Sequence, residues 1–213
     1  MVSLPIIQTK LFVPPPRAAR VLLPRLIEKL NTGLSRKLIM LSAPAGFGKT
    51  TLLSSWVRQI TAAQVAWVSL DKEDNDPSRF FAYFIAALQT NESDMGAGVL
   101  AAAQSSGAQN AESVVTTLIN EIAESEGDWV LILDDYHLIE SRSVDAAIAF
   151  VLDHLSPRMH VVMLTRADPR FPLPRMRASG ELLEIRARDL RFSLAETVEF
   201  LRQMLGTDLS GEN

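Results

Sequence analysis

The sequence predicts an α/β fold in which a mostly parallel, five-stranded sheet lies between two layers of helices. Short, uniformly apolar runs alternate along the chain with longer segments of helical periodicity. Such runs are typical of strands that are buried on both faces, as in parallel sheets covered by helices on each side. The five expected strands are residues 38–42, 65–70, 129–133, 160–165 and 182–185.

The helices expected between these strands follow from apolar spacing. Residues 24–31, 50–60, 78–88, 114–122 and 144–155 have the spacing of helices with one buried face. Ser193 and Glu196 have the pattern of a capping box, which predicts a last helix over residues 195–205. Residues 91–110 have only a faint helical signal, and the Arg/Pro-rich stretch before the fifth strand is expected to be a loop.

Composition excludes several classes of protein. The chain has 213 residues, 47% of them hydrophobic, enough for one domain with or without an appendage. A net charge of −4 gives no overall reason to bind a polyanion. The absence of cysteine excludes disulfides and thiolate metal sites. Without a leader or an apolar run of bilayer length, we expect a cytoplasmic protein that does not enter membranes.

A short Gly-containing segment has the pattern of a phosphate-binding loop. It joins an apolar strand to a helix through Gly46 and Gly48. The glycines let backbone N–H groups converge on phosphate oxygens, and the helix N-terminus adds partial positive charge. The sequence therefore predicts an ATP/ADP site whose contacts are Ala45, Gly46, Phe47, Gly48, Lys49, Thr50 and Thr51.

Two residues at the start of the following helix have side-chain roles. Lys49 is expected to reach the β- and γ-phosphates, and Thr50 to supply a hydroxyl to Mg²⁺. Ala43 stands where such loops usually have a glycine. The turn at this position must therefore be one that a small Cβ tolerates.

Two carboxylates, Asp134 and Asp135, follow four apolar residues at the carboxyl end of an expected buried strand. Ligands of open α/β sheets bind at this edge. Asp134 is expected to hold Mg²⁺, directly or through a water, because this hard cation prefers oxygen ligands. For Asp135 the sequence leaves two roles open: it orients or deprotonates the attacking water, or it caps the turn before Tyr136.

The sequence also assigns roles to other residues, and for Arg166 it leaves two roles open. Arg166 follows the next buried strand, so it either senses the terminal phosphate or forms a surface salt bridge. His137 is interpreted as a structural hydrogen-bonding residue, and Trp67 and Trp129 as core. The acidic turn 71–76 lacks the glycine and distal glutamate of an EF-hand and is interpreted as a solvated loop.

With these motifs, the chain resembles the nucleotide-binding domain of MalT-like, LuxR-family large ATP-binding transcriptional regulators, which belong to the STAND class of P-loop NTPases. The resemblance covers nearly the whole chain and implies a three-layer P-loop NTPase sandwich of the AAA+/STAND type. The residues that carry it are Thr9–Pro14 with Arg17, Ala43–Thr51, Trp67–Asp71, Asp74–Asp76, Arg79, Phe80, Leu133–Leu138, Thr165–Pro169, Leu182–Ile185 and Leu190–Phe192.

The resemblance also implies roles for single residues. ATP and ADP would stabilise different states, with Mg-nucleotide held by Lys49, Thr50 and Asp134. Arg166 would be the sensor arginine, and the arm with the helix start at Arg25 would cover the adenine.

The same resemblance implies a division of the chain. Residues 1–32 form an arm and first helix over the nucleotide, residues 33–192 the NTPase core, and residues 193–213 a helix and tail leading to a further domain. DNA would be bound only by a C-terminal domain beyond this chain, and self-association of the full-length protein is left open.

Three functions are compatible with these residues. The favoured one is a signalling module whose slow ATP hydrolysis resets a switch. In a P-loop phosphotransferase, the arginines of residues 166–177 would instead form a lid over a small acceptor. A docking domain would bind nucleotide without turnover. The Asp134–Asp135 pair and the long arm fit the phosphotransferase less well.

Overall fold

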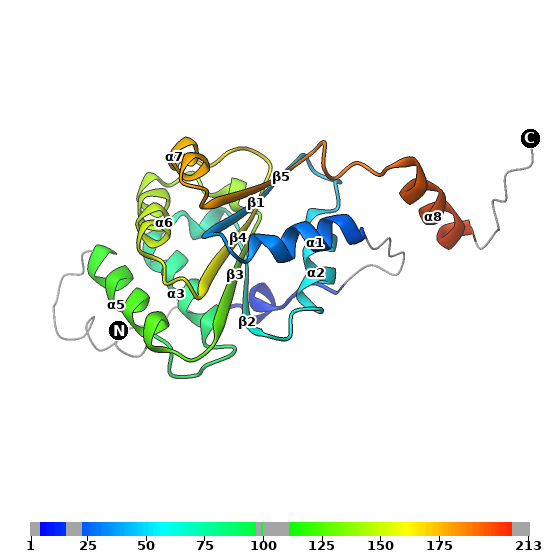
Figure 1. Cartoon of the computed structure of the whole chain (residues 1–213). Coiled ribbons are helices and arrows are strands. Elements are labelled where there is room, and N and C mark those ends of the chain that lie inside the picture. Colours follow the sequence, from blue (N-terminus) through cyan, green and yellow to red (C-terminus); the bar gives the residue numbers. More distant parts are fainter. Residues whose placement is uncertain (1–4, 16–22, 97–98, 100–110, 206–213) are drawn as a thin grey trace, which may run out of the picture.

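A parallel five-stranded sheet is the centre of the computed structural model, which describes residues 5–15, 23–96, 99 and 111–205 (Figure 1). Its strand order is β2-β3-β4-β1-β5, and every neighbouring pair is parallel. The strands are β1 (Leu38–Ser42), β2 (Ala63–Ser69), β3 (Asp128–Asp134), β4 (Met159–Thr165) and β5 (Leu182–Arg186). The expected sheet is confirmed, and it is parallel throughout.

Helices cover both faces of this sheet (Figure 1). One face carries α1 (Pro24–Gly33) and α2 (Lys49–Val57). The other carries α3 (Pro77–Leu88), α5 (Ala111–Glu124), α6 (Arg142–His154) and α7 (Leu173–Ala178). The last helix, α8 (Leu194–Leu205), stands away from these layers. None of the helices in the described ranges is long and apolar enough to cross a membrane.

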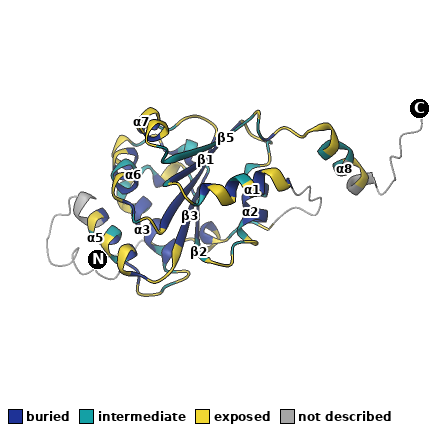
Figure 2. Cartoon of the chain, viewed as in Figure 1, coloured by how far each residue is buried: buried dark blue, intermediate teal, exposed yellow. Residues whose placement is uncertain are grey.

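Two hydrophobic cores form because successive strand side chains point to opposite faces of the sheet. Ile39 and Leu41 pack with α1 and α2, whereas Met40 packs with the helices of the other face. Figure 2 shows the strands as the most buried part of the molecule. Trp67 and Trp129 are 1% and 0% exposed, which confirms their assignment to the core.

The stretch expected to be a loop before β5 contains α7, which is a correction to the sequence prediction. The helix has only six residues and carries a proline in its first turn, where the missing N–H is tolerated. Leu173 and Met176 bury it against the core. One and a half turns give too few apolar positions for a periodic signal. Most of the stretch 91–110 lies outside the described residues, so its faint helical signal stays untested.

The described part of the N-terminal arm, residues 5–15, packs against β2 and α3 through the 3₁₀ turn η1 (Gln8–Leu11). This turn buries Lys10 beside two carboxylates. The Lys10 Nζ lies 3.0 Å from Asp71 Oδ2 and also contacts Asp74 Oδ2. The same Nζ lies 4.0 Å from the centroid of the Tyr83 ring.

The acidic turn 71–76 is therefore not fully solvated, contrary to the sequence interpretation. Asp74 is 0% exposed. It accepts hydrogen bonds from Lys10 and from Arg79 Nε, the latter at 3.2 Å. Two cations thus compensate the buried charge, and both lie outside the turn: Lys10 is in the arm, and Arg79 is in α3.

Replacing Lys10 by Met should lower the free energy of unfolding by about 3 kcal/mol, because Asp74 would stay buried with one cation fewer. Urea unfolding followed by circular dichroism measures this difference. The control Lys72→Ala, at an exposed position in the same turn, should change stability by less than about 0.5 kcal/mol. A loss below about 1 kcal/mol for Lys10→Met would mean that Arg79 alone compensates Asp74.

Candidate nucleotide-binding site

The phosphate-binding loop runs from the end of β1 to the start of α2, as the sequence predicts. Gly46 and Gly48 have φ angles of 83° and 75°, which L side chains rarely adopt. A Cβ at either position would meet no atom within 4 Å, so conformation and not space requires glycine. Ala43 is not among the described residues with positive φ, so its turn tolerates a Cβ as expected.

The N-terminus of α2 is open to an anion. Gly48 is its N-cap and offers no side-chain hydrogen bond to the first turn. The unpaired N–H groups at a helix start carry partial positive charge and bind phosphate oxygens. The loop residues Pro44, Ala45, Gly46 and Gly48 are exposed, so their backbone is accessible.

Lys49 is folded over this loop. Its Nζ donates hydrogen bonds to the carbonyls of Ala43 at 2.6 Å and Pro44 at 3.1 Å. Partial burial, and then the nearby charge of Arg166, lower the pKa of Lys49, while Asp135 and Asp134 oppose this shift. The positive charge of the Lys49 ammonium group is therefore incompletely compensated by the protein. The oxygens of a phosphate chain would complete this compensation.

The two expected Mg²⁺ ligands are brought together from different segments. Thr50 Oγ1 donates a hydrogen bond to Asp134 Oδ2 at 3.1 Å and lies 3.4 Å from Oδ1. Hydroxyl and carboxylate oxygens are ligands that Mg²⁺ uses beside nucleotide phosphates. The described residues contain no cluster of three or more carboxylates or imidazoles for a metal. This donor set fits an ion that takes its other ligands from phosphate and water.

Asp134 is a buried carboxylate, 4% exposed at the end of β3. Burial, and then the charge of Asp135, raise its pKa to about 6. The hydrogen bonds from Thr50 and from the Asp135 N–H, together with the charge of Lys49, act in the opposite direction. A cation at this position would remove the cost of the buried charge.

Asp135 has a backbone conformation that is uncommon for a residue with a side chain. Its φ and ψ are 57° and 34°, in the left-handed region. It is the N-cap residue of η3 (Tyr136–Leu138), yet its side chain makes no capping hydrogen bond. The side chain is 47% exposed. Of the two roles left open by the sequence, side-chain capping is therefore not observed.

His137 was interpreted as a structural hydrogen-bonding residue, and for its Nδ1 this is wrong. That nitrogen is buried and has no hydrogen-bond partner among the described residues. It lies 3.7 Å from Asp135 Oδ1. Burial, and then Arg166, lower the pKa of His137. Burial and the charge of Arg166 thus favour the uncharged form of this imidazole beside Asp135. Its position three residues after Asp134 was the only sequence signal for it.

Arg166 lies at the same edge of the sheet, because β4 pairs directly with β3. Its side chain is exposed, and its charge lowers the pKa of both Lys49 and His137. Within the described ranges, Arg166 makes no hydrogen bond or ion pair. The alternative of a surface salt bridge is thus not observed for Arg166.

Arg25 is engaged by the segment between β5 and α8. Its guanidinium donates to Glu196 Oε1 at 2.8 Å, to the Asp189 carbonyl at 2.6 Å and to the Arg191 carbonyl at 2.8 Å. The expected capping box of α8 is confirmed in the same place, since Ser193 N donates to Glu196 Oε2 at 2.7 Å. Residues 16–22 lie outside the described residues, so the predicted adenine contact of Arg25 and the arm stays a prediction.

A match to a family model identifies the group of P-loop proteins to which this chain belongs. The family model described as AAA ATPase domain matches residues 17–164. The chain belongs to the AAA ATPase domain family. The matched range includes the phosphate-binding loop, Asp134 and all but the last residue of β4.

The sequence of this AAA ATPase domain is similar to part of the sequence of one type of transcriptional regulator. It is 31% identical over 204 residues to the HTH-type transcriptional regulator MalT of Yersinia enterocolitica, which covers 96% of this chain and 22% of the relative. The MalT of Klebsiella pneumoniae is 32% identical over 189 residues, 89% of this chain and 21% of the relative. The chain thus spans about a fifth of the length of these relatives.

Solved structures confirm the AAA+/STAND type of fold. The STAND protein with a tetratricopeptide repeat sensor, PH0952 from Pyrococcus horikoshii, has a TM-score of 0.62 at 14% identity over 91% of this chain and 26% of its own. Cdc6p from Pyrobaculum aerophilum has a TM-score of 0.57 at 13% identity over 93% and 53%. At such identities the similarity describes the fold alone.

The burial of Asp134 predicts a pH-dependent effect of Asp134→Asn in the absence of nucleotide and metal. The folded carboxyl has a pKa of about 6, above the ordinary aspartate value of 3.8 that applies in the unfolded chain, so stability is lost as the pH rises through this range. Asp134→Asn should raise the free energy of unfolding by up to about 3 kcal/mol at pH 7.5 and by about half of that at pH 5.

Urea titrations at the two pH values measure this difference. Asp128→Asn, at the exposed first residue of β3, is the matched control and should change stability little at either pH. An effect of Asp134→Asn that is the same at both pH values would show that charge burial is not its cause.

Proposed function

We propose that this AAA ATPase domain binds Mg-ATP and Mg-ADP and acts as a slow ATPase switch in a LuxR-family transcriptional regulator. The observation that carries the proposal is the contact of Thr50 with Asp134 beside the phosphate-binding loop. The relatives named as HTH-type transcriptional regulators support the wider context. DNA would be bound outside this chain, and self-association and a cytoplasmic location stay predictions.

In this proposal each part of the site has one task. Loop N–H groups and the α2 terminus hold the phosphates, and Lys49 exchanges its carbonyl partners for phosphate oxygens. Thr50 and Asp134 hold Mg²⁺, which when bound would neutralise charge on the phosphates. Asp135 orients the attacking water, and Arg166 distinguishes ATP from ADP at the terminal phosphate.

The ion pairs of the Arg/Pro-rich segment favour this function over a phosphotransferase. Arg175 pairs with Asp153 at 3.3 Å, and Arg177 pairs with Glu184 at 2.6 Å. Arginines that are engaged on the protein surface are less available as a lid over an acceptor. A docking domain without turnover has the same binding site, so a hydrolysis assay is needed to separate it from a switch.

Replacing Lys49 by Ala should weaken Mg-ATP binding about ten- to a hundred-fold, because each charge-assisted phosphate contact is worth roughly 1.5–3 kcal/mol. Calorimetric titration measures the affinity. Nucleotide carried through purification is first removed and identified by mass analysis. The matched control is Lys37→Ala, a lysine paired with Glu181 just before β5, which should leave binding unchanged. Unchanged affinity in Lys49→Ala would contradict the site.

Replacing Arg166 by Ala should reduce the affinity for Mg-ATP more than that for Mg-ADP, because only ATP has the terminal phosphate. Parallel titrations with the two nucleotides give the ratio of dissociation constants. Arg175→Ala removes an exposed arginine of the same segment on α7 and should preserve this ratio. If both affinities fall equally in Arg166→Ala, the sensor role is wrong.

A further inference from the structure

The loop between β3 and α6, residues 135–141, carries Asp135 in a conformation that needs support; we call it the Asp135 loop. A non-glycine residue in the left-handed region is held there only when its surroundings fix it. One support is internal, since the Asp135 N–H donates to Asp134 Oδ1 at 2.9 Å. A second is Tyr136, whose buried hydroxyl donates to Asp145 Oδ1 of α6 at 2.8 Å.

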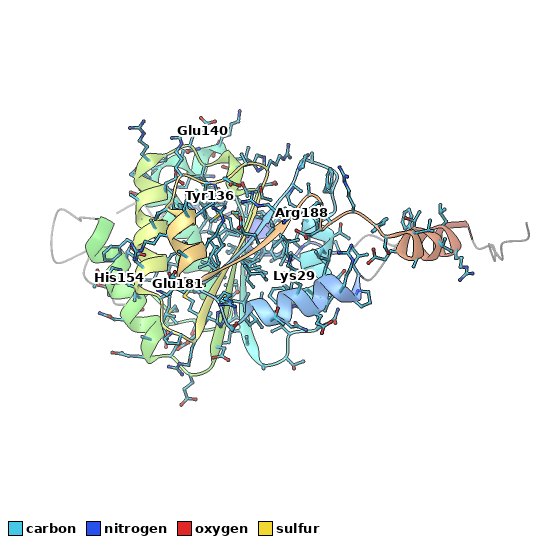
Figure 3. The ribbon with its side chains drawn as sticks, turned by 45° about the horizontal axis from the view of Figure 1, so that its top comes forward. Lys29, Tyr136, Glu140, His154, Glu181 and Arg188 are labelled. Atoms are coloured by element: carbon cyan, nitrogen blue, oxygen red, sulfur yellow. The ribbon has the colours of Figure 1, made fainter. Side chains whose placement is uncertain are left out.

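The remaining support comes from Asn75, at the end of the 3₁₀ turn η2 (Lys72–Asn75). Its Oδ1 accepts hydrogen bonds from the backbone N–H groups of Glu140 at 2.6 Å and Ser141 at 2.8 Å. Its Nδ2 donates to the Leu138 carbonyl at 2.9 Å. Figure 3 shows Tyr136 and Glu140 on this loop, away from Glu181 at the opposite end of the sheet.

The hydrogen-bonding capacity of the Asn75 amide is used fully. Its second N–H donates to the carbonyl of Lys72 at 2.9 Å, within its own turn. An amide offers two donors and two acceptor lone pairs. Asn75 therefore joins η2 to the Asp135 loop by three of its four bonds, a pattern that other side chains of similar size do not reproduce.

The turn that carries Asn75 is itself firmly held. Asp71 accepts from the Glu73 N–H at 2.8 Å, and Asp74 accepts from the Asp71 N–H at 2.8 Å, which together form a capping box. Lys10 and Arg79 fix the buried Asp74 from two other elements. Asn75 thus connects the Asp135 loop to a base whose position does not depend on that loop.

We propose that Asn75 is a positioning residue for ATP hydrolysis, which keeps the Asp135 carboxylate where it orients the attacking water. This inference rests on the proposed function. In the reaction, the water oxygen bonds to the γ-phosphorus while the bond to the β–γ bridging oxygen breaks, giving ADP and phosphate. Asp135 accepts the proton of the water. Asn75 acts only through the loop and touches no reacting atom.

The test compares three ligands that differ at the γ-position: Mg-ADP alone, Mg-ADP with beryllium fluoride, and Mg-ADP with aluminium fluoride. Beryllium fluoride imitates the bound phosphate before attack, whereas planar aluminium fluoride imitates the transferring group and needs the oriented water. Binding of the transition-state mimic does not require measurable turnover. A residue that positions the water should therefore affect this ligand selectively.

Asn75→Ala should weaken binding of the aluminium fluoride complex about tenfold and leave the other two ligands within about twofold. Asn75→Asp keeps acceptors for Glu140 and Ser141 but loses the donor to Leu138, so it should recover part of the affinity. Asn91→Ala is the matched control. It removes a side-chain bond to the Val65 carbonyl at 2.8 Å in β2 and should change none of the three affinities.

Each other outcome contradicts the inference. An equal loss for all three ligands, or no loss for any, would show that Asn75 does not position the water. A wild-type chain that binds Mg-ADP but gains nothing from aluminium fluoride would overturn the inference alone. A wild-type chain that binds none of the ligands would overturn the proposed function as well, and the wild-type titration shows this by itself. If Asn75→Ala does not fold, Asn75→Asp decides by the same comparison.

Discussion

The burial of one carboxylate, Asp134, is the constraint on which the candidate site depends. A parallel sheet with both faces covered is built from apolar strands, and such a strand accepts a charge only at its end. There Thr50 and the next backbone N–H supply hydrogen bonds, and Lys49 supplies an opposite charge. These groups come from the segments that follow β1 and β3, two strands with β4 between them, so the strand order β3-β4-β1 determines which side chains share the site.

Sequence patterns predict the parts of this structure that depend on local periodicity or on a fixed spacing. The five strands, the phosphate-binding loop with Gly46 and Gly48, and the capping box of Ser193 are of this kind. The neighbourhood of Arg166 and Asp134 is also predictable, because each follows a buried strand and parallel strands end at one edge. It needed only the assumption that β3 and β4 are adjacent.

Long-range pairing is what the sequence could not show. The burial of Asp74 depends on Lys10, which lies in the arm 64 positions earlier. Three of the four hydrogen bonds of Asn75 depend on how two crossover loops meet. So does the burial of His137 Nδ1, which has no hydrogen-bond partner among the described residues. Polar residues in a turn have the same sequence signature whether they face solvent or another loop. Only the tertiary structure distinguishes the two cases.

The attachment of α8 has a mechanical consequence. Figures 1 and 2 show this helix beyond the two helical layers, with Leu194 83% exposed at its first turn. Its described link to α1 is the fork of Arg25, which binds Glu196 and two backbone carbonyls. Twelve helical residues extend about 18 Å. A tilt of about 10° at this joint would therefore displace the far end of α8 by about 3 Å.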